Sequence, residues 1–264
     1  MTRVLLFFVG LALVACGEKK SSELKSGNEY WCSNHCSFVE SIGNRSQVQA
    51  FDNVAEYLEK DSDSSILQRY GFYVKHDDQP SGLAERKERL HEAIVRVVGD
   101  DENKIALMLI MAMAETYEMR GWDTIKDSAT DGSRNFTIFN MNEDYLNSIR
   151  HDLNHNPLAF EKGLSDPMGD IWDWSVFNQN EGWGELDKQV YLLNASLELW
   201  GVTNVLTIHR YGYHGVEGKA FDPLTLIYVD GVREGVKWLL ENPEYFRPGG
   251  SKMGHRVAGN IPHI

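Results

Sequence analysis

One carboxylate of this chain directly follows an unbroken apolar segment. Residues 105–114 read IALMLIMAMA, and the next residue is Glu115. Strong helix formers dominate this segment, and a helix that is apolar on all sides is buried on all sides. The segment therefore predicts a central helix with Glu115 at its end. Burial raises the pKa of a carboxyl group, which lets a general acid keep its proton near neutral pH. The structural alternative is a Glu115 that pairs with an arginine or caps a neighbouring helix.

The stretch after Glu115 is rich in groups that suit a sugar. Carboxylates and amides match the hydroxyl groups of a carbohydrate, and aromatic rings offer stacking faces. The candidate substrate-binding residues here are Tyr117, Trp122, Asp123, Asn135, Asn140 and Asn142. A second catalytic carboxylate would come from Asp123, Asp127 or Asp131, and we favour Asp127 and Asp131. The alternative is a solvated loop. The spacing of the aspartates does not match a calcium-binding EF-hand loop, so no metal is predicted.

Four histidines support a different hypothesis. His151 and His155 are four residues apart in a predicted helix, whereas His209 and His214 enclose the segment HRYGYH. Two histidines at a spacing of four can share a zinc ion, so a zinc-dependent hydrolase that uses all four is an alternative. The glutamate of the H-E-x-x-H signature is absent, because Asp152 follows His151. Surface or capping histidines are the simpler explanation.

The HRYGYH segment is also rich in tyrosine and arginine, which is typical of a subsite that binds a carbohydrate. We therefore include His209, Arg210 and Tyr213 among the substrate-binding candidates, and His209 with Arg210 could orient a carboxylate in a cleft. Three tryptophans could stack on sugars or belong to the core: Trp172, Trp174 and Trp183.

Apolar residues recur mostly at helical spacing. They predict helices at about 48–58, 83–98, 105–115, 141–153, 187–200 and 223–241, and residues 136–139 are the best candidate for a short strand. No internal repeat and no second low-complexity segment interrupts the chain. The expected fold is therefore mainly α with little β, in one domain from residue 29 to 264.

The order of these features resembles the lysozyme-like superfamily, which includes lytic transglycosylases, muramidases and chitosanases. In that superfamily a buried helix ends in the catalytic glutamate, a small β-hairpin follows, and a further helix opens on a G-L-[MF]-Q type motif. In this chain MAMAET carries Glu115 in the matching place, and NFTIFNMN stands where the returning motif would be. Residues 139–142 read FNMN, so the Gly-Leu-Phe-Gln motif itself is missing.

Residues 101–150 are more specifically similar to uncharacterised secreted proteins, mostly fungal, that share the pattern M-A-x-x-E-T…S-K-D…D-G-x-x-N. The superfamily resemblance implies an α+β lysozyme-like fold in which Glu115 donates a proton to a glycosidic oxygen. A second carboxylate would activate water or attack the sugar, and a transglycosylase route would need none.

The charge of the chain limits the substrates and partners that we expect. Asp and Glu number 39 against 26 Lys and Arg, which gives a net charge of −13. No cationic excess exists to bind phosphates, so nucleic acid is not expected as a partner. A β-linked amino-sugar polymer, peptidoglycan or chitin and chitosan, is the expected substrate, and the charge favours a neutral or cationic one. No cofactor is expected. A glycan-binding protein without catalysis is a further alternative.

The N-terminus predicts export from the cytosol. Arg3 precedes the apolar run 4–15, which suits a secretory signal peptide over residues 1–16. The junction Leu-Val-Ala-Cys resembles a bacterial lipobox, in which Cys16 would be lipidated; ordinary cleavage near residue 15 is the alternative. Residues 17–28 are polar and predict a flexible tether. The protein is expected to be secreted, and it would contact a membrane only through a lipid anchor if the lipobox is used.

Two further cysteines suit an oxidising compartment. Cys32 and Cys36 remain once Cys16 is lipidated or removed, and their C-x3-C spacing predicts a local disulfide. Such a bond closes only a small loop, so it would fix a turn and not brace the whole fold.

Overall fold

The apolar segment forms helix α5 (Glu102–Glu115) in the computed structural model of the protein. All ten residues of 105–114 are buried, as the sequence predicts. The side chain of Asp101 caps the helix, because its Oδ1 accepts a hydrogen bond of 3.1 Å from the backbone N–H of Lys104. The helix ends at Glu115, so its last side chain emerges at the boundary of the core.

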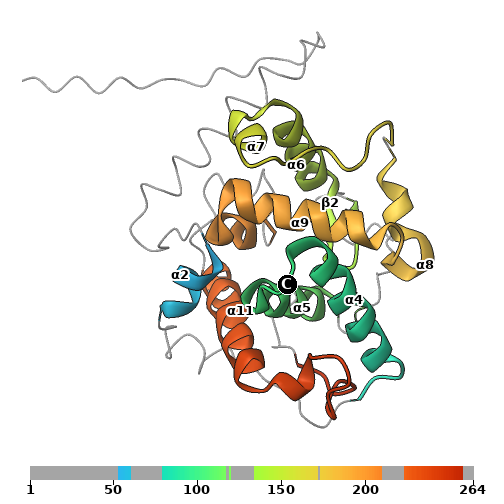
Figure 1. Ribbon diagram of the computed structural model, residues 1–264, viewed down its shortest axis with the longest axis vertical. Helices are drawn as coiled ribbons and strands as arrows, with labels where there is room; N and C mark the ends of the chain where they lie inside the picture. The colour runs from blue at the N-terminus through green and yellow to red at the C-terminus, as the bar shows by residue number, and fades with distance from the viewer. Residues whose placement is uncertain are drawn as a thin grey trace, which may run out of the picture.

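The structure describes residues 53–60, 79–116, 119, 134–171, 173–209 and 223–257. These residues are mainly helical and contain one two-stranded sheet, which confirms the mainly α fold class (Figure 1). Across the same ranges, no helix has the length and apolar character needed to span a membrane. The predicted signal peptide, the tether and all three cysteines (Cys16, Cys32 and Cys36) lie outside the described residues.

Helices surround α5. Both α4 (Leu83–Val98) and α11 (Pro223–Glu241) pack directly on it, and α9 (Leu186–Trp200) packs on α4 and on α6 (Glu143–His155). Figure 1 shows α5 in the middle of the molecule, with α9 crossing between it and α6. The predicted bounds of α4 and α11 are confirmed, and those of α6 and α9 differ by one or two residues.

Helix α2 (Val54–Glu59) closes the core beside α11. It corresponds to the end of the helix that the sequence predicts at 48–58. Its Tyr57 is fully buried, and the guanidinium group of Arg233 lies 4.5 Å from the centre of the Tyr57 ring. The Nε of Arg233 also donates a hydrogen bond of 2.8 Å to the backbone oxygen of Tyr57. These contacts attach a short N-terminal helix to the C-terminal helix of the fold.

Several short elements follow α6, and periodicity did not predict them. They are α7 (Pro157–Glu161), η1 (Trp174–Asn178), α8 (Gln179–Gly182) and η2 (Pro243–Tyr245). Residues 202–209 are also helical. Elements of five residues or fewer show too little of a helical period to be recognised.

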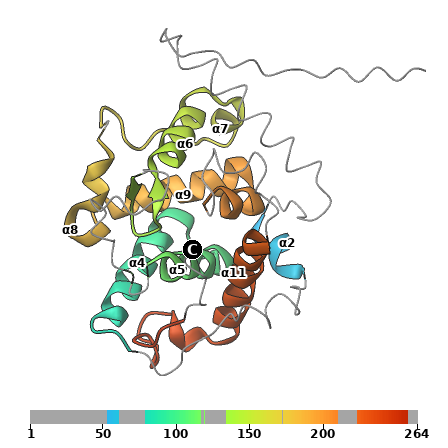
Figure 2. The ribbon, with the colours of Figure 1, turned by 180° about the vertical axis from the view of Figure 1, so that it is seen from behind.

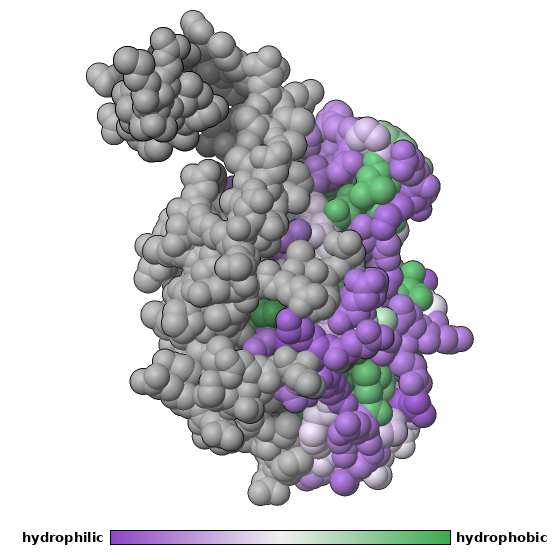
Figure 3. Space-filling model, turned by 90° about the vertical axis from the view of Figure 1, so that its left-hand side faces the viewer, coloured by the Kyte–Doolittle hydropathy of each residue, from purple (hydrophilic) through white to green (hydrophobic). Residues whose placement is uncertain are grey.

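On α7 two apolar side chains are exposed, Leu158 and Phe160. The described part of the face shown in Figure 3 is mostly hydrophilic, with small separate hydrophobic areas.

The two strands are shorter than the sequence predicts. Strand β1 (Asn135–Phe136) pairs antiparallel with β2 (Met141–Asn142), with Asn135 opposite Asn142. The prediction of a strand at 136–139 is wrong beyond residue 136, because residues 137–140 form the turn of the hairpin. The apolar residues of this turn, Ile138 and Phe139, are buried in the core.

A buried glutamine on α9 fixes the hairpin turn. The Oε1 atom of Gln189 accepts a hydrogen bond of 3.0 Å from the backbone N–H of Ile138. Its Nε2 donates to the backbone oxygens of Gly182 and Gly184, at 2.8 and 2.6 Å. A buried amide whose donors and acceptor are all used specifies one arrangement of the groups around it. Gln189 therefore holds the hairpin and the α8–α9 connection in place together.

A buried lysine links α4 to the C-terminal segment. The Nζ of Lys87 donates hydrogen bonds to the backbone oxygens of Tyr245, at 3.1 Å, and His255, at 2.5 Å. Burial lowers the pKa of Lys87 from its ordinary value of 10.5 to about 7. Above pH 7 the folded protein releases this proton while the unfolded chain keeps it.

This difference predicts a pH-dependent contribution to stability. Because the unfolded state binds more protons between pH 7 and 10.5, the free energy of unfolding should rise with pH in that interval, by at most about 1.4 kcal/mol per pH unit. In Lys87→Met this contribution should be missing. Urea unfolding of both proteins at pH 7, 8 and 9 measures it, with Lys188→Met as a control at a partly exposed lysine. Identical pH slopes in the parent protein and in Lys87→Met would contradict the assignment.

Candidate functional site

Side chains from three separate parts of the fold meet at the end of α5. The Oε1 of Glu115 lies 3.3 Å from the Nε2 of His209, and its Oε2 accepts a hydrogen bond of 3.3 Å from the Nδ2 of Asn140. Asn140 belongs to the hairpin turn, and His209 ends the helix over residues 202–209. Figure 2 shows the hairpin next to α6 and α9. The Glu115 side chain is 14% exposed and that of His209 only 1%, so Glu115 is the more accessible of these two groups.

The hairpin turn has an unusual backbone that places Asn140. Thr137 and Asn140 both adopt left-handed conformations, with φ of 72° and 57°. Asparagine tolerates this region, whereas a β-branched threonine rarely adopts it. The Oγ1 of Thr137 accepts hydrogen bonds from the N–H groups of Phe139, at 3.2 Å, and Met141, at 3.4 Å, which stabilise the turn. Such strain costs on the order of 1–3 kcal/mol and is typical of functional sites.

The His209 ring is held by two buried tyrosines. Tyr228 of α11 stacks on it, with centroids 6.2 Å apart, and Tyr145 of α6 meets it edge-on at 6.3 Å. The Nδ1 of His209 is buried and has no hydrogen-bond partner among the described residues. The Nε2 of His209 is the ring nitrogen that faces Glu115, at 3.3 Å from its Oε1.

The pKa of Glu115 is lowered from its ordinary value, contrary to the expectation from the sequence. Burial alone would raise it, but the charge of His209 and hydrogen bonds from His209, Tyr228 and Asn140 outweigh burial. The sequence shows that Glu115 follows a buried helix, and it does not show which polar groups the fold brings to the carboxyl. Near neutral pH, Glu115 is therefore ionised.

The other predicted site residues have different positions. The Oδ1 of Asn142 caps α6 by accepting a hydrogen bond of 2.7 Å from the N–H of Tyr145, so a structural role accounts for it. Asn135 is opposite Asn142 in the sheet. Trp174 and Trp183 are buried, as expected of core residues. The remaining candidates lie outside the described residues: Tyr117, Trp122, Asp123, Asp127, Asp131, Trp172, Arg210, Tyr213 and His214.

The histidines of the zinc hypothesis do not form one cluster where the structure describes them. His151 and His155 lie on α6 and line a cavity that does not include His209. His209 instead faces Glu115. In the described ranges, no three His, Cys, Asp or Glu side chains are grouped to hold a metal ion.

Three cavities are lined by described residues that do not include Glu115. The cavity with the two histidines has a volume of about 610 Å³, another beside Trp183 about 600 Å³, and a third beside Phe246 about 370 Å³. Residues 117–118 and 120–133, which follow Glu115, and residues 210–222, which follow His209, are outside the described part of the chain. The described surroundings of the carboxyl group are therefore the cluster with His209, Asn140 and Tyr228.

Comparison of the chain with protein-family models, with curated proteins and with solved structures gives no match. The function therefore has to be argued from the chemistry of the residues around Glu115.

Removal of the imidazole should reverse the pKa shift of Glu115. In His209→Gln the charge that favours the carboxylate is gone while burial remains, so the Glu115 pKa should rise. A carbon-13 NMR titration of the glutamate carboxyl groups measures this, with Glu115→Gln used to assign the resonance. Asn140→Ala should shift the pKa in the same direction and by less, and His155→Gln should have no effect. An unchanged Glu115 titration in both site variants would show that these contacts do not control the proton.

Proposed function

We propose that the protein is an extracytoplasmic glycoside-cleaving enzyme that acts on a β-linked amino-sugar polymer, with Glu115 as the proton donor. One observation carries the proposal: the central helix ends in a carboxyl group that is partly exposed and is contacted by polar side chains from three other elements. Perturbed pKa values concentrate at functional sites, where polar neighbours set the protonation state of a carboxyl group.

In this proposal Glu115 and His209 have different roles. Since His209 is almost fully buried, Glu115 is the group that exchanges a proton with a glycosidic oxygen. His209, Tyr228 and Asn140 stabilise the carboxylate that remains after the transfer. A lowered pKa makes Glu115 a stronger donor, but it also means that the protonated form is abundant only in acid. The proposed enzyme therefore works best at acidic pH.

The order of elements supports a lysozyme-like arrangement. Helix α5 ends in Glu115, the small β1–β2 hairpin follows, and α6 begins directly after it. We retain Asp127 and Asp131 as proposed partners, one of which would activate water or attack the sugar. The net charge of −13 favours a neutral or cationic polymer such as chitin or chitosan over an anionic cell wall.

A glycan-binding protein without turnover is the second candidate, and the lowered pKa of Glu115 favours it. In that case the pairing of Glu115 with His209 would hold the end of α5 in place, and no proton would be transferred.

Substitution of Glu115 separates the two candidates. Glu115→Gln keeps the size of the side chain and removes the transferable proton, so the release of soluble fragments from chitin, chitosan or peptidoglycan should fall by roughly 100-fold or more. Product release is measured by chromatography of the reducing ends, and circular dichroism tests the fold. Glu241→Gln, an exposed change at the end of α11, is the control. A substrate that binds the parent protein without yielding any product would support the binding protein instead.

The pH profile tests the protonation state. As Glu115 must be protonated to donate, kcat/KM should increase as the pH falls toward the lowered pKa of Glu115 and should be small at pH 7. In His209→Gln the increase in kcat/KM should begin at a higher pH, because the substitution raises the Glu115 pKa. An activity plateau that extends through neutral pH in the parent protein would mean that Glu115 is not the acid.

A further inference from the structure

A cavity of about 600 Å³ is lined by residues of α4 and of the segment 179–188, which covers α8 and the start of α9. Its volume is within the range of about 300–1,000 Å³ that is usual for small-molecule sites. The lining contains Arg89 of α4 together with Gln179, Asn180 and Trp183. The proposed glycoside chemistry uses none of these side chains, so the cavity needs a separate explanation.

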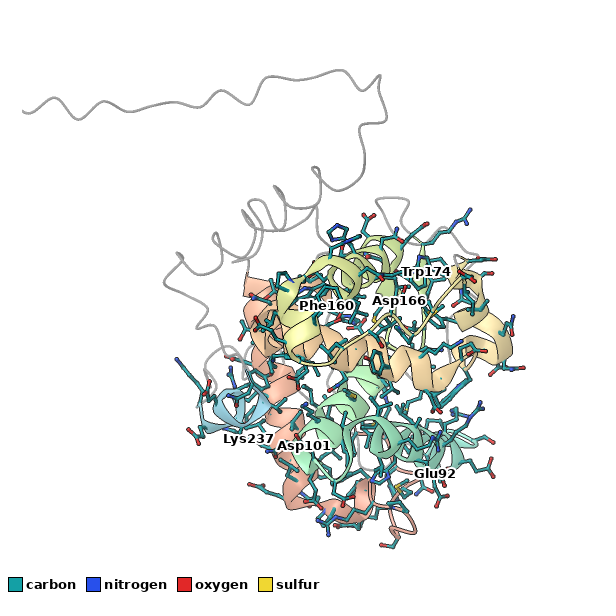
Figure 4. The ribbon with its side chains drawn as sticks, turned by 45° about the horizontal axis from the view of Figure 1, so that its top comes forward. Glu92, Asp101, Phe160, Asp166, Trp174 and Lys237 are labelled. Atoms are coloured by element: carbon teal, nitrogen blue, oxygen red, sulfur yellow. The ribbon has the colours of Figure 1, made fainter. Side chains whose placement is uncertain are left out.

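Arg89 has a positive charge that no described carboxylate balances. Its guanidinium group lies 5.0 Å from the centre of the Trp183 ring, and its side chain forms no ion pair or hydrogen bond with a described residue. Glu85 and Glu92 are four residues before it and three residues after it on α4, at spacings that favour ion pairs within a helix. Figure 4 shows Glu92 on α4, at the surface of the molecule. Arg89 therefore packs on the indole although carboxylates are available on its own helix.

The other charged side chains of the lining are paired with each other. The Nη2 of Arg96 donates to Oδ1 of Asp187 at 2.8 Å, and its Nε donates to Oδ2 at 3.3 Å. The Nζ of Lys188 lies 2.8 Å from Oε2 of Glu185. All residues of this lining are described, and Arg89 is the charged one among them without a counter-charge. An anion that enters the cavity therefore meets a positive charge that is not already neutralised.

The indole supports the guanidinium group and leaves its hydrogen-bond donors available. Trp183 is only 4% exposed, so its position is fixed by the core. A guanidinium group that packs on an aromatic ring can still use its N–H groups, and two parallel N–H groups match the two oxygens of a carboxylate. The side-chain amides of Gln179 and Asn180 are exposed and form no hydrogen bond with described residues. They are further donors for the same ligand.

The segment that forms one wall of the cavity has an unusual backbone. Asn180, Glu181 and Glu185 adopt left-handed conformations, with φ of 52°, 60° and 48°. The Nε2 of Gln189 holds this segment by donating a hydrogen bond of 2.8 Å to the backbone oxygen of Gly182. Residues in sparsely populated conformations are typical of ligand-binding and active sites, where the surrounding structure maintains them. This backbone therefore supports a binding role for the wall.

We propose that this cavity binds a small organic anion through its carboxylate group, which pairs with Arg89. The amides of Gln179 and Asn180 contact polar groups next to that carboxylate. The ligand class is that of acidic monosaccharides and related hydroxy acids, because these molecules combine a carboxylate with hydroxyl groups. The site is separate from Glu115, and the inference does not depend on the proposed function.

Titration of the full-length chain with D-glucuronate tests the site, with D-glucose as the matched ligand that lacks the carboxylate. In NMR spectra of the arginine Nε–H groups, the signal that is missing in Arg89→Gln belongs to Arg89. This signal should shift with glucuronate and stay unchanged with glucose. By isothermal titration, Arg89→Gln should weaken glucuronate binding by about tenfold or more. Arg89→Lys keeps the charge without the paired N–H donors, so it should restore binding only in part.

Two further variants serve as controls. Arg89 is exposed, so its replacement leaves the core intact. Arg247→Gln removes another exposed arginine, one that pairs with Glu102, and it should bind glucuronate as the parent protein does. Glu115→Gln should also retain full affinity, because Glu115 does not line this cavity. Affinity should decrease as the salt concentration rises, since dissolved ions screen the charge of Arg89.

The outcomes distinguish this site from the proposed function. Loss of affinity in Arg89→Gln, with affinity retained in Arg247→Gln and Glu115→Gln, would support the site even if no glycan is cleaved. The inference would be overturned by equal binding of glucuronate and glucose, by an affinity that Arg89→Gln leaves unchanged, or by no binding at all. Inorganic phosphate that binds at Arg89 as tightly as glucuronate would overturn the assignment to carboxylates.

Discussion

The contact between Glu115 and His209 is the interaction on which the candidate site depends. The apolar sequence of α5 requires that helix to be central, and its last residue is a carboxylate. An ionised group at the edge of a core is costly unless other groups compensate its charge. His209, Tyr228 and Asn140 supply that compensation, to the extent that the pKa of Glu115 falls below its ordinary value. The same compensation is what a proton donor needs after it has lost its proton.

The fold stabilises this arrangement by constraints at several positions. The left-handed backbone at Thr137 and Asn140 directs the hairpin turn toward the end of α5. Gln189 holds that turn from α9 through the N–H of Ile138. The helix over residues 202–209 brings His209 between two tyrosine rings. Left-handed backbone at non-glycine residues lowers the stability of a fold. It is typical of functional sites, where the geometry serves the chemistry.

The sequence predicted the helices well and the site in part. Periodicity located α4 and α11 at their observed bounds, because long amphipathic segments carry a strong period. The run from Ile105 to Ala114 predicted the central helix and placed Glu115 at its end. The hairpin was misjudged because buried apolar residues in a turn resemble a strand. The pKa of Glu115 was predicted in the wrong direction, since burial can be read from neighbouring residues, whereas Tyr228 of α11 approaches the carboxyl only after folding. Asn140 and His209 were identified by their chemistry, but their distances to Glu115 required the structure.

The most direct test of the central claim is a crystal structure of Glu115→Gln with a chitin or chitosan oligosaccharide. The variant cannot transfer the proton, so an intact sugar chain should remain bound. The account predicts a glycosidic oxygen within hydrogen-bond distance of the side-chain amide at position 115, with Asn140 and His209 still in contact with that amide. A sugar chain bound elsewhere on the protein, with the residue at 115 closed off from it, would contradict the account.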